Sequence, residues 1–201
     1  MNAIPSSVSG TGSVTVETYA GSTLIGSNSY SFTVTVPASI VPTIGSVTAT
    51  RIDNTVPAGW GIYVQNKSGV KITANSCSGA YSSTIVSYVY SGGASASSTS
   101  NTYTLSPITQ SGTISFTVTI KDSRGRTASK SASITVYQYS APSFTASVAY
   151  RCTSAGESNE NGTYIGARSN YNLSTCNGKN TATLQAFYAR SDSSSWTNGA
   201  T

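Results

Sequence analysis

The side chains that most often carry catalysis are scarce in this chain of 201 residues. It contains no histidine, which removes the usual general base, the Ser–His and Cys–His nucleophile pairs and the commonest metal ligand. Its six carboxylates are Glu17, Asp53, Asp122, Glu157, Glu160 and Asp192. A glycosidase needs two carboxylates flanking one bond, and only Glu157 and Glu160 lie close together in sequence. Their Gly, Ser and Asn neighbours indicate a solvated loop, so we expect no catalytic residues and no enzyme activity.

The same loop, residues 155–162, also carries the oxygen ligands that Ca²⁺ prefers. It lacks the regular Asp/Asn alternation of a dedicated calcium loop, so a solvated loop is again the favoured interpretation. We therefore expect no metal and no cofactor.

Three cysteines, Cys77, Cys152 and Cys176, fit no metal-ligand spacing. Their odd number argues against a full disulfide framework. Three reduced, partly buried thiols are the favoured interpretation, and a Cys152–Cys176 disulfide is the alternative.

The formal net charge of +5 arises because acids are few, and the eleven Lys and Arg residues are spread along the chain. Nucleic-acid-binding proteins usually gather them on one face, so we expect no nucleic-acid partner. The densest basic cluster is Lys121, Arg124, Arg126 and Lys130, around a turn. A solvated turn is the favoured interpretation, and contact with an anionic wall polymer or a neighbouring subunit is the alternative.

Two tryptophans complete the candidate surface-binding residues, which are Trp60, Trp196, Lys121, Arg124 and Arg126. Trp60 lies between Gly59 and Gly61 and leads into a strand, so we interpret it first as a core tryptophan between two sheets. Exposed in a bend, it would instead stack on a sugar ring. Trp196 lies in a Ser-rich, loop-like segment.

Strand signals dominate the rest of the chain. Ile114, Phe116, Val118 and Ile120 alternate with threonine and serine, the period-2 pattern of a strand with one buried face. Residues 31–36 alternate in the same way. The segment from Asp122 to Arg126 lies between two strong strands and predicts a hairpin turn. No segment has a convincing helical period, so the sequence predicts an all-β fold.

An internal repeat sets the predicted domain organisation. Residues 12–51 align without a gap to residues 112–151, at an offset of 100 and with the hydrophobic alternation in phase. Pro42 recurs as Pro142, and Arg51 recurs as Arg151. The sequence therefore predicts tandem immunoglobulin-like β-sandwich repeats of about 100 residues.

The repeat places one complete sandwich at residues 42–141. Residues 1–41 are then the C-terminal strands of a partial unit, and residues 142–201 begin another. A fragment of a longer polypeptide is the favoured explanation of these partial units. The alternative is strand donation, in which the N-terminal strands of one chain complete the C-terminal partial unit of another chain.

Short motifs give the sequence a family resemblance. Residues 118–128, residues 139–142 and 149–152, and the turns at 162–164 and 177–180 resemble segments of tail-associated structural proteins of siphophages that infect Gram-positive bacteria. That resemblance implies arrays of immunoglobulin-like or fibronectin-like units in the virion, at or near the tail, made in the cytoplasm of the bacterial host. It implies no catalytic residues.

Two functions follow as hypotheses. The first is a non-catalytic virion structural protein, a tail or baseplate spacer or decoration, whose partners are other virion proteins, copies of itself or a host cell-wall glycan. The second is a bacterial cell-surface adhesin or carbohydrate-binding module, which usually needs a secretion signal that residues 1–10 do not resemble. No apolar run approaches the ~20 residues that span a bilayer, so no membrane insertion is expected.

Overall fold

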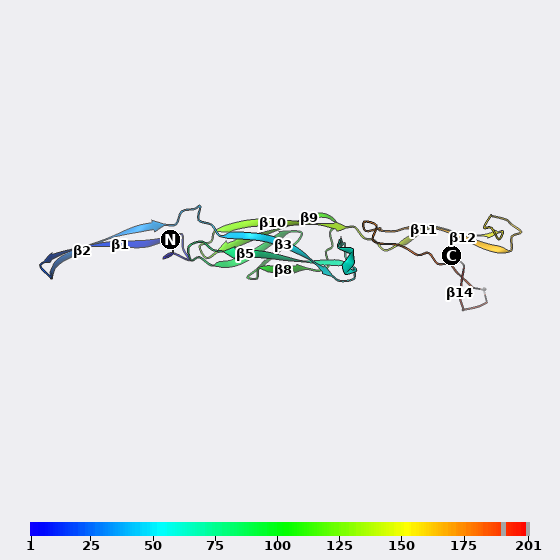
Figure 1. The fold of residues 1–201 in the computed structure, drawn as a ribbon, viewed down its shortest axis with the longest axis horizontal. Coiled ribbons are helices and arrows are strands. Elements are labelled where there is room, and N and C mark those ends of the chain that lie inside the picture. The colour runs from blue at the N-terminus through cyan, green and yellow to red at the C-terminus, as the bar shows by residue number, and fades with distance from the viewer. Residues whose placement is uncertain (190–191, 200–201) are drawn as a thin grey trace. The chain divides into compact units, whose positions relative to one another are not determined.

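A computed structural model describes residues 1–189 and 192–199, which form fourteen strands and one 3-10 helix (Figure 1). The predicted all-β fold is confirmed. The chain divides into two compact units, Met1–Val136 and Tyr137–Thr201. The first unit contains a long hairpin and a β-sandwich.

The long hairpin consists of β1 (Ser9–Ala20) and β2 (Thr23–Thr35), paired antiparallel through a turn at Gly21 and Ser22. Up to an irregularity in the pairing between Thr18 and Tyr19, the alternation of side chains gives it two different faces. One face is almost entirely serine and threonine, and on it Thr15 and Ser29 share a hydrogen bond of 2.7 Å. The other carries exposed apolar side chains, namely Val14, Val16, Tyr30, Phe32 and Val34. An isolated two-stranded sheet of this kind is marginally stable in water.

The sandwich has two sheets. The first contains β3 (Thr43–Asp53), β5 (Ser68–Ser78) and β8 (Thr102–Leu105), in the order β3-β5-β8. The second contains β4 (Tyr63–Val64), β6 (Ile85–Gly92), β7 (Ala96–Ser98), β9 (Gly112–Asp122) and β10 (Thr127–Tyr137), in the order β4-β10-β9-β6-β7. In the letters of the immunoglobulin fold these sheets are A-B-E and A′-G-F-C-C′. The short 3-10 helix η1 (Ala58–Trp60) lies between β3 and β4.

The core lies between these two sheets. From the first sheet β5 contributes Val70 and Ile72, and from the second β9 contributes Phe116 and Val118, all four buried. The intervening threonines of β9 point outward, where they bond serines of β10 across the strand pair. The period-2 pattern in the sequence therefore decides which face of β9 is buried, as predicted.

The second unit is more open. It contains β11 (Ser143–Cys152) paired with β12 (Tyr164–Asn172), and the short pair β13 (Phe187–Tyr188) and β14 (Thr197–Asn198). Most of its apolar side chains are exposed, and Ile165 keeps 76% of its surface accessible. Among the described residues these two pairs are separate two-stranded sheets.

The two units contain corresponding strands. β3 begins at residue 43 and pairs with the next long strand, β5; β11 begins at residue 143 and pairs with β12. Arg51 donates to the carbonyl oxygen of Ala58, the first residue of η1 after β3, and Arg151 donates to that of Glu160 in the loop that follows β11. The boundaries 1–41, 42–141 and 142–201 stay a prediction, because contacts group the long hairpin with the sandwich.

Candidate interaction surfaces

The predicted basic hairpin tip is the turn between β9 and β10, and Asp122 organises it. One carboxylate oxygen accepts the backbone N–H groups of Arg124 and Arg126, at 3.0 and 2.9 Å. The other accepts the Ser83 hydroxyl at 3.1 Å. Gly125 adopts φ +82°, a left-handed conformation that favours glycine. The sequence Asp-Ser-Arg-Gly-Arg is therefore a turn with a carboxylate at its centre, which explains why Asp122 is buried.

Arg124 points into the protein. Only 6% of its surface is accessible, and its guanidinium donates to four backbone carbonyl oxygens. Two belong to the loop before β6, Ala80 at 2.5 Å and Tyr81 at 2.6 Å. The other two belong to the segment before β1, Ile4 at 2.8 Å and Met1 at 3.4 Å. The fixed fork of five donors in arginine suits this role.

Arg126 holds the other side of the same junction. Its guanidinium donates to the carbonyl oxygens of Val36, Pro37 and Ile40, in the segment that connects β2 to β3. Ser123 adds a bond from its hydroxyl to the carbonyl oxygen of Pro5, at 2.6 Å. The turn therefore binds both backbone segments that flank the long hairpin.

The structure thus separates the predicted basic cluster. Lys121 is exposed, Arg126 is half-buried and Arg124 is buried. The expectation that the cluster is a solvated turn is wrong for Arg124, because its donors are used on carbonyls of its own chain. Lys130 is an exposed residue of β10, and its ammonium group donates to the carbonyl oxygen of Gly45. Binding of an outside ligand by Lys121 or Arg126 stays a prediction.

Neither tryptophan belongs to the buried core cluster of the sandwich. Trp60 ends the short helix η1, is half-buried and does not belong to the core cluster, so its interpretation as a core tryptophan is wrong. The buried aromatic side chains of that cluster are Tyr90 and Phe116 instead. Trp196 precedes β14 and has 70% of its surface accessible. Ligand binding by either tryptophan stays a prediction.

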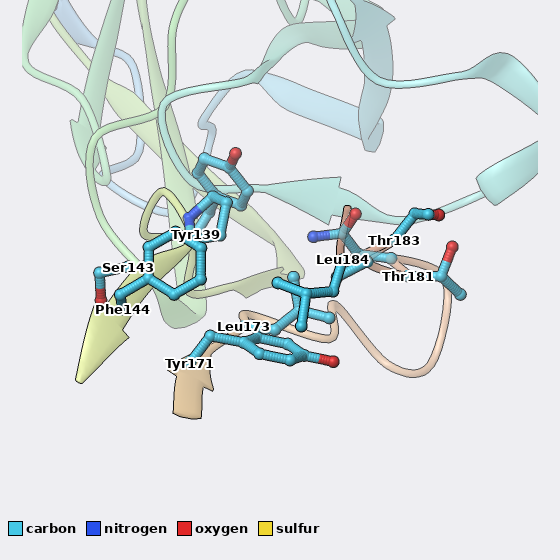
Figure 2. A pocket seen from close by; sticks show the side chains of 11 residues that line it. Tyr139, Ser143, Phe144, Tyr171, Leu173, Thr181, Thr183 and Leu184 are labelled. Atoms are coloured by element: carbon cyan, nitrogen blue, oxygen red, sulfur yellow. The ribbon is translucent and has the colours of Figure 1, made fainter. Parts of the chain in front are cut away.

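A groove of about 380 Å³ lies in the second unit. Its lining residues are Tyr139, Pro142, Ser143, Phe144, Tyr171, Leu173, Asn180, Thr181, Ala182, Thr183 and Leu184. Figure 2 shows the rings of Tyr139 and Phe144 on one side and Thr183 and Leu184 on the other. The lining carries no charged side chain. It can therefore accept an apolar side chain or a neutral ring with a few hydroxyl groups.

The sequence did not indicate this groove. Its aromatic side chains come from the linker after β10, from β11 and from β12, so no local motif contains them. Phe144 and Tyr171 come together only when β11 pairs with β12, which places the two residues directly opposite each other.

The described residues contain no group of three or more His, Cys, Asp or Glu side chains able to hold a metal ion. Glu157 and Glu160 are exposed in the loop between β11 and β12. No helix among residues 1–189 and 192–199 is long and apolar enough to cross a membrane.

All three cysteines are free thiols, with Cys152 and Cys176 buried. Burial raises the pKa of Cys77 and of Cys176 above the ordinary thiol value. In the sandwich, burial, followed by the neighbouring Tyr88 and Cys77, raises the pKa of Tyr90 to about 12. These groups are thus held in their neutral forms at physiological pH, as structural side chains rather than nucleophiles.

The strand order and the buried core define an all-β protein with an immunoglobulin-like sandwich. Residues 1–190 match the family described as "Siphovirus protein of unknown function (DUF859)". The chain belongs to this siphovirus protein family. A search of curated proteins found no match.

Seven solved protein chains also match. One comes from a study of the promiscuous specificity of carbohydrate-binding modules of the β-sandwich superfamily, at 19% identity and a TM-score of 0.37, covering 63% of this chain and 52% of that one. The match thus spans about half the length of that structure. Another is a fibronectin(III)-like module of CbhA from Clostridium thermocellum, at 16% identity and a TM-score of 0.33, covering 63% and 77%. With TM-scores of 0.37 and 0.33, neither match says what this chain does.

Proposed function

We propose that this chain is a non-catalytic structural protein of the siphovirus virion, a spacer or decoration of the tail or baseplate. Membership of the siphovirus family across residues 1–190 is the observation that carries the proposal. The absence of histidine from the sequence, and of a metal-binding group from the described residues, agrees with a role that does not involve catalysis.

The hairpin turn at Asp122 supports a spacer function. Arg124 and Arg126 together bond backbone carbonyls on both sides of the long hairpin, which resists rotation at that junction. A spacer must transmit position along an assembly, and a junction with bonds on two sides does so better than a flexible linker. Its partners in this proposal are other virion proteins or copies of the chain.

The test is immunogold electron microscopy of purified particles of a siphovirus that encodes the chain, with antibodies raised against the purified protein. Labelling of the tail or baseplate is expected, together with peptides of the chain in the virion by mass spectrometry. Absence from washed virions, with the protein present in the infected cell, would reject the proposal. Hydrolysis of cell-wall material by the pure protein would reject its non-catalytic part.

Contact with a host-surface glycan is a second candidate function, favoured by the exposed Trp196 ring. Aromatic rings of this kind stack on the apolar faces of sugars. Binding of purified cell-wall polysaccharide, measured by calorimetry, should then weaken in Trp196→Ala or Trp60→Ala. Tyr30→Ala, in the first unit, serves as the control because its ring is equally exposed. Equal binding by all of these variants would exclude the two tryptophans.

A further inference from the structure

The loop before β6 contains an unfavourable backbone conformation. Tyr81 and Ser82 adopt φ values of +48° and +63°, and the N–H of Ser83 donates to the carbonyl oxygen of Ala80 at 3.2 Å. A four-residue turn whose two central residues both have positive φ is normally made by Asn, Asp and Gly, because other side chains clash with the backbone there. Tyrosine and serine therefore form the 80–83 turn at a cost in conformational energy.

The second unit forms the same kind of turn from residues that favour it. After β12, Asn177 and Gly178 adopt φ values of +59° and +72°. The N–H of Lys179 donates to the carbonyl oxygen of Cys176 at 3.3 Å. Asn-Gly is a preferred pair for this turn, so its conformation agrees with its own sequence. The 80–83 turn lacks that agreement, and contacts outside the turn must hold it.

Arg124 supplies those contacts. Its Nη1 atom donates to the carbonyl oxygen of Ala80 at 2.5 Å, and its Nη2 atom donates to that of Tyr81 at 2.6 Å. The Asp122 carboxylate accepts the Ser83 hydroxyl at 3.1 Å. A strained conformation persists where the surrounding structure over-determines it, and the β9–β10 turn does so here.

The same guanidinium also bonds the segment before β1. Its Nε atom donates to the carbonyl oxygen of Ile4 at 2.8 Å, and its Nη2 atom donates to that of Met1 at 3.4 Å. The Nη2 group thus joins Met1 directly to Tyr81. Because Arg124 is buried, loss of the acceptors in residues 1–4 would leave donors unpaired or draw the guanidinium toward water. Either outcome weakens its hold on the 80–83 turn.

We propose that the 80–83 turn is a strained element that Arg124 holds closed while residues 1–4 are in place, so that the turn and this segment order and release together. Release of the segment lets Tyr81 and Ser82 return to negative φ, which moves the exposed Tyr81 side chain. The position of the chain before the long hairpin is thereby transmitted to the loop that leads into β6. The coupling is reciprocal, so an ordered turn also favours an ordered segment.

This inference goes beyond the proposed function and does not depend on it, because it uses only contacts within the first unit. Its two parts, the strain in the turn and the coupling to residues 1–4, are tested separately on the whole protein.

The strain is tested by giving the 80–83 turn the residues of the turn in the second unit. Tyr81→Asn combined with Ser82→Gly should raise the urea midpoint of the first unit, because the new residues tolerate positive φ. Tyr81→Phe combined with Ser82→Ala is the matched control. It changes the same side chains but keeps two residues that disfavour positive φ, so it should not raise the midpoint. Equal midpoints for the two double variants would overturn the proposal.

The coupling is tested by amide hydrogen exchange at Ser83, whose N–H closes the turn. Ile4→Gly loosens residues 1–4 by removing the side chain that lies beside Gly10. Arg124→Lys keeps the charge but loses the planar fork of donors. Each should quicken exchange at Ser83 by roughly tenfold, the effect of losing about one hydrogen bond to a charged group.

The variant with the Asn-Gly turn separates strain from simple loosening. In that background, Ile4→Gly and Arg124→Lys should leave exchange at Ser83 nearly unchanged, because the turn no longer needs to be held. The N–H of Gly125, which bonds the carbonyl oxygen of Asp122 within the β9–β10 turn, is the internal control and should keep its rate in Ile4→Gly. Unchanged exchange at Ser83 in either single variant would overturn the coupling. Equal acceleration in both backgrounds would overturn it as well.

Discussion

The Nε atom of Arg124 donates a hydrogen bond to the carbonyl oxygen of Ile4, 2.8 Å away and 120 residues earlier in the chain. The bond joins the sandwich to the segment that precedes the long hairpin. Because the guanidinium is buried and meets carbonyl oxygens rather than a carboxylate, its geometry is set by the backbone on both sides. A single side chain thereby couples the first eight residues to the sandwich.

Replacing Arg124 by methionine should destabilise the first unit by about 2–4 kcal/mol, since several carbonyl oxygens lose a charged donor and remain partly buried. Urea unfolding at neutral pH measures the change in unfolding free energy. Amide hydrogen exchange should quicken in residues 1–8 and in the 80–84 loop, while β5 and β9 stay protected.

The matched control for this variant is Lys121→Met, which removes an exposed cation three residues earlier in the chain, near the end of β9. It should change the unfolding free energy by less than about 0.5 kcal/mol. Equal effects of the two substitutions would contradict the structural role of Arg124.

Gly92→Ala should be strongly destabilising. Gly92 has φ +95° at the end of β6, and a Cβ there would overlap the carbonyl oxygen of Ser115 on β9. We expect a loss of about 2–4 kcal/mol in unfolding free energy, because both the conformation and the space disfavour alanine. Gly59→Ala is the control, since its added Cβ would meet open space. A neutral Gly92→Ala would show that β6 pairs with β9 in another way.

The sequence predicted the strands well because burial in a sandwich follows a local period of two residues. Phe116 and Val118 face the core for the same reason that they alternate with threonine. The turn at Asp122 was likewise predicted, since Asp and Gly act through their own backbone.

The function of the turn was not predictable, because it depends on contacts across more than 80 residues. A run of arginines beside a turn normally indicates a solvated surface, and nothing local distinguishes Arg124 from Lys121. Trp60 was misassigned for a related reason. A tryptophan near a strand is a frequent core residue, but here Trp60 ends the short helix η1, whose other two residues are exposed, and Tyr90 and Phe116 are the aromatic residues of the core.

Alkaline pH should weaken the sandwich through Tyr90. Its hydroxyl donates to the carbonyl oxygen of Ser100 at 3.0 Å, and burial, together with the neighbouring Tyr88 and Cys77, raises its pKa from 10.0 to about 12. The ionised form is thus disfavoured more in the folded protein than in the unfolded chain. The stabilisation is fully present below pH 10 and is lost as the pH rises toward about 12.

Urea unfolding at a series of alkaline pH values measures this loss, and ultraviolet difference spectra follow the tyrosine ionisation. Tyr90→Phe should flatten the fall in unfolding free energy between pH 10 and 12, whereas Tyr30→Phe, on the exposed hairpin face, should leave it unchanged. An identical pH profile for Tyr90→Phe and the unaltered protein would refute the assignment.

The cysteines should behave as three separate thiols. Cys152 and Cys176 are both buried in the second unit and both free, and burial raises the pKa of Cys176. A raised pKa lowers the thiolate fraction at neutral pH, so alkylation of the native protein should be slower than in urea. In urea without any reductant, intact mass spectrometry should find three labels per chain. One label in place of three would mean that two of the cysteines are joined, and the alternative Cys152–Cys176 disulfide would then replace the free thiols.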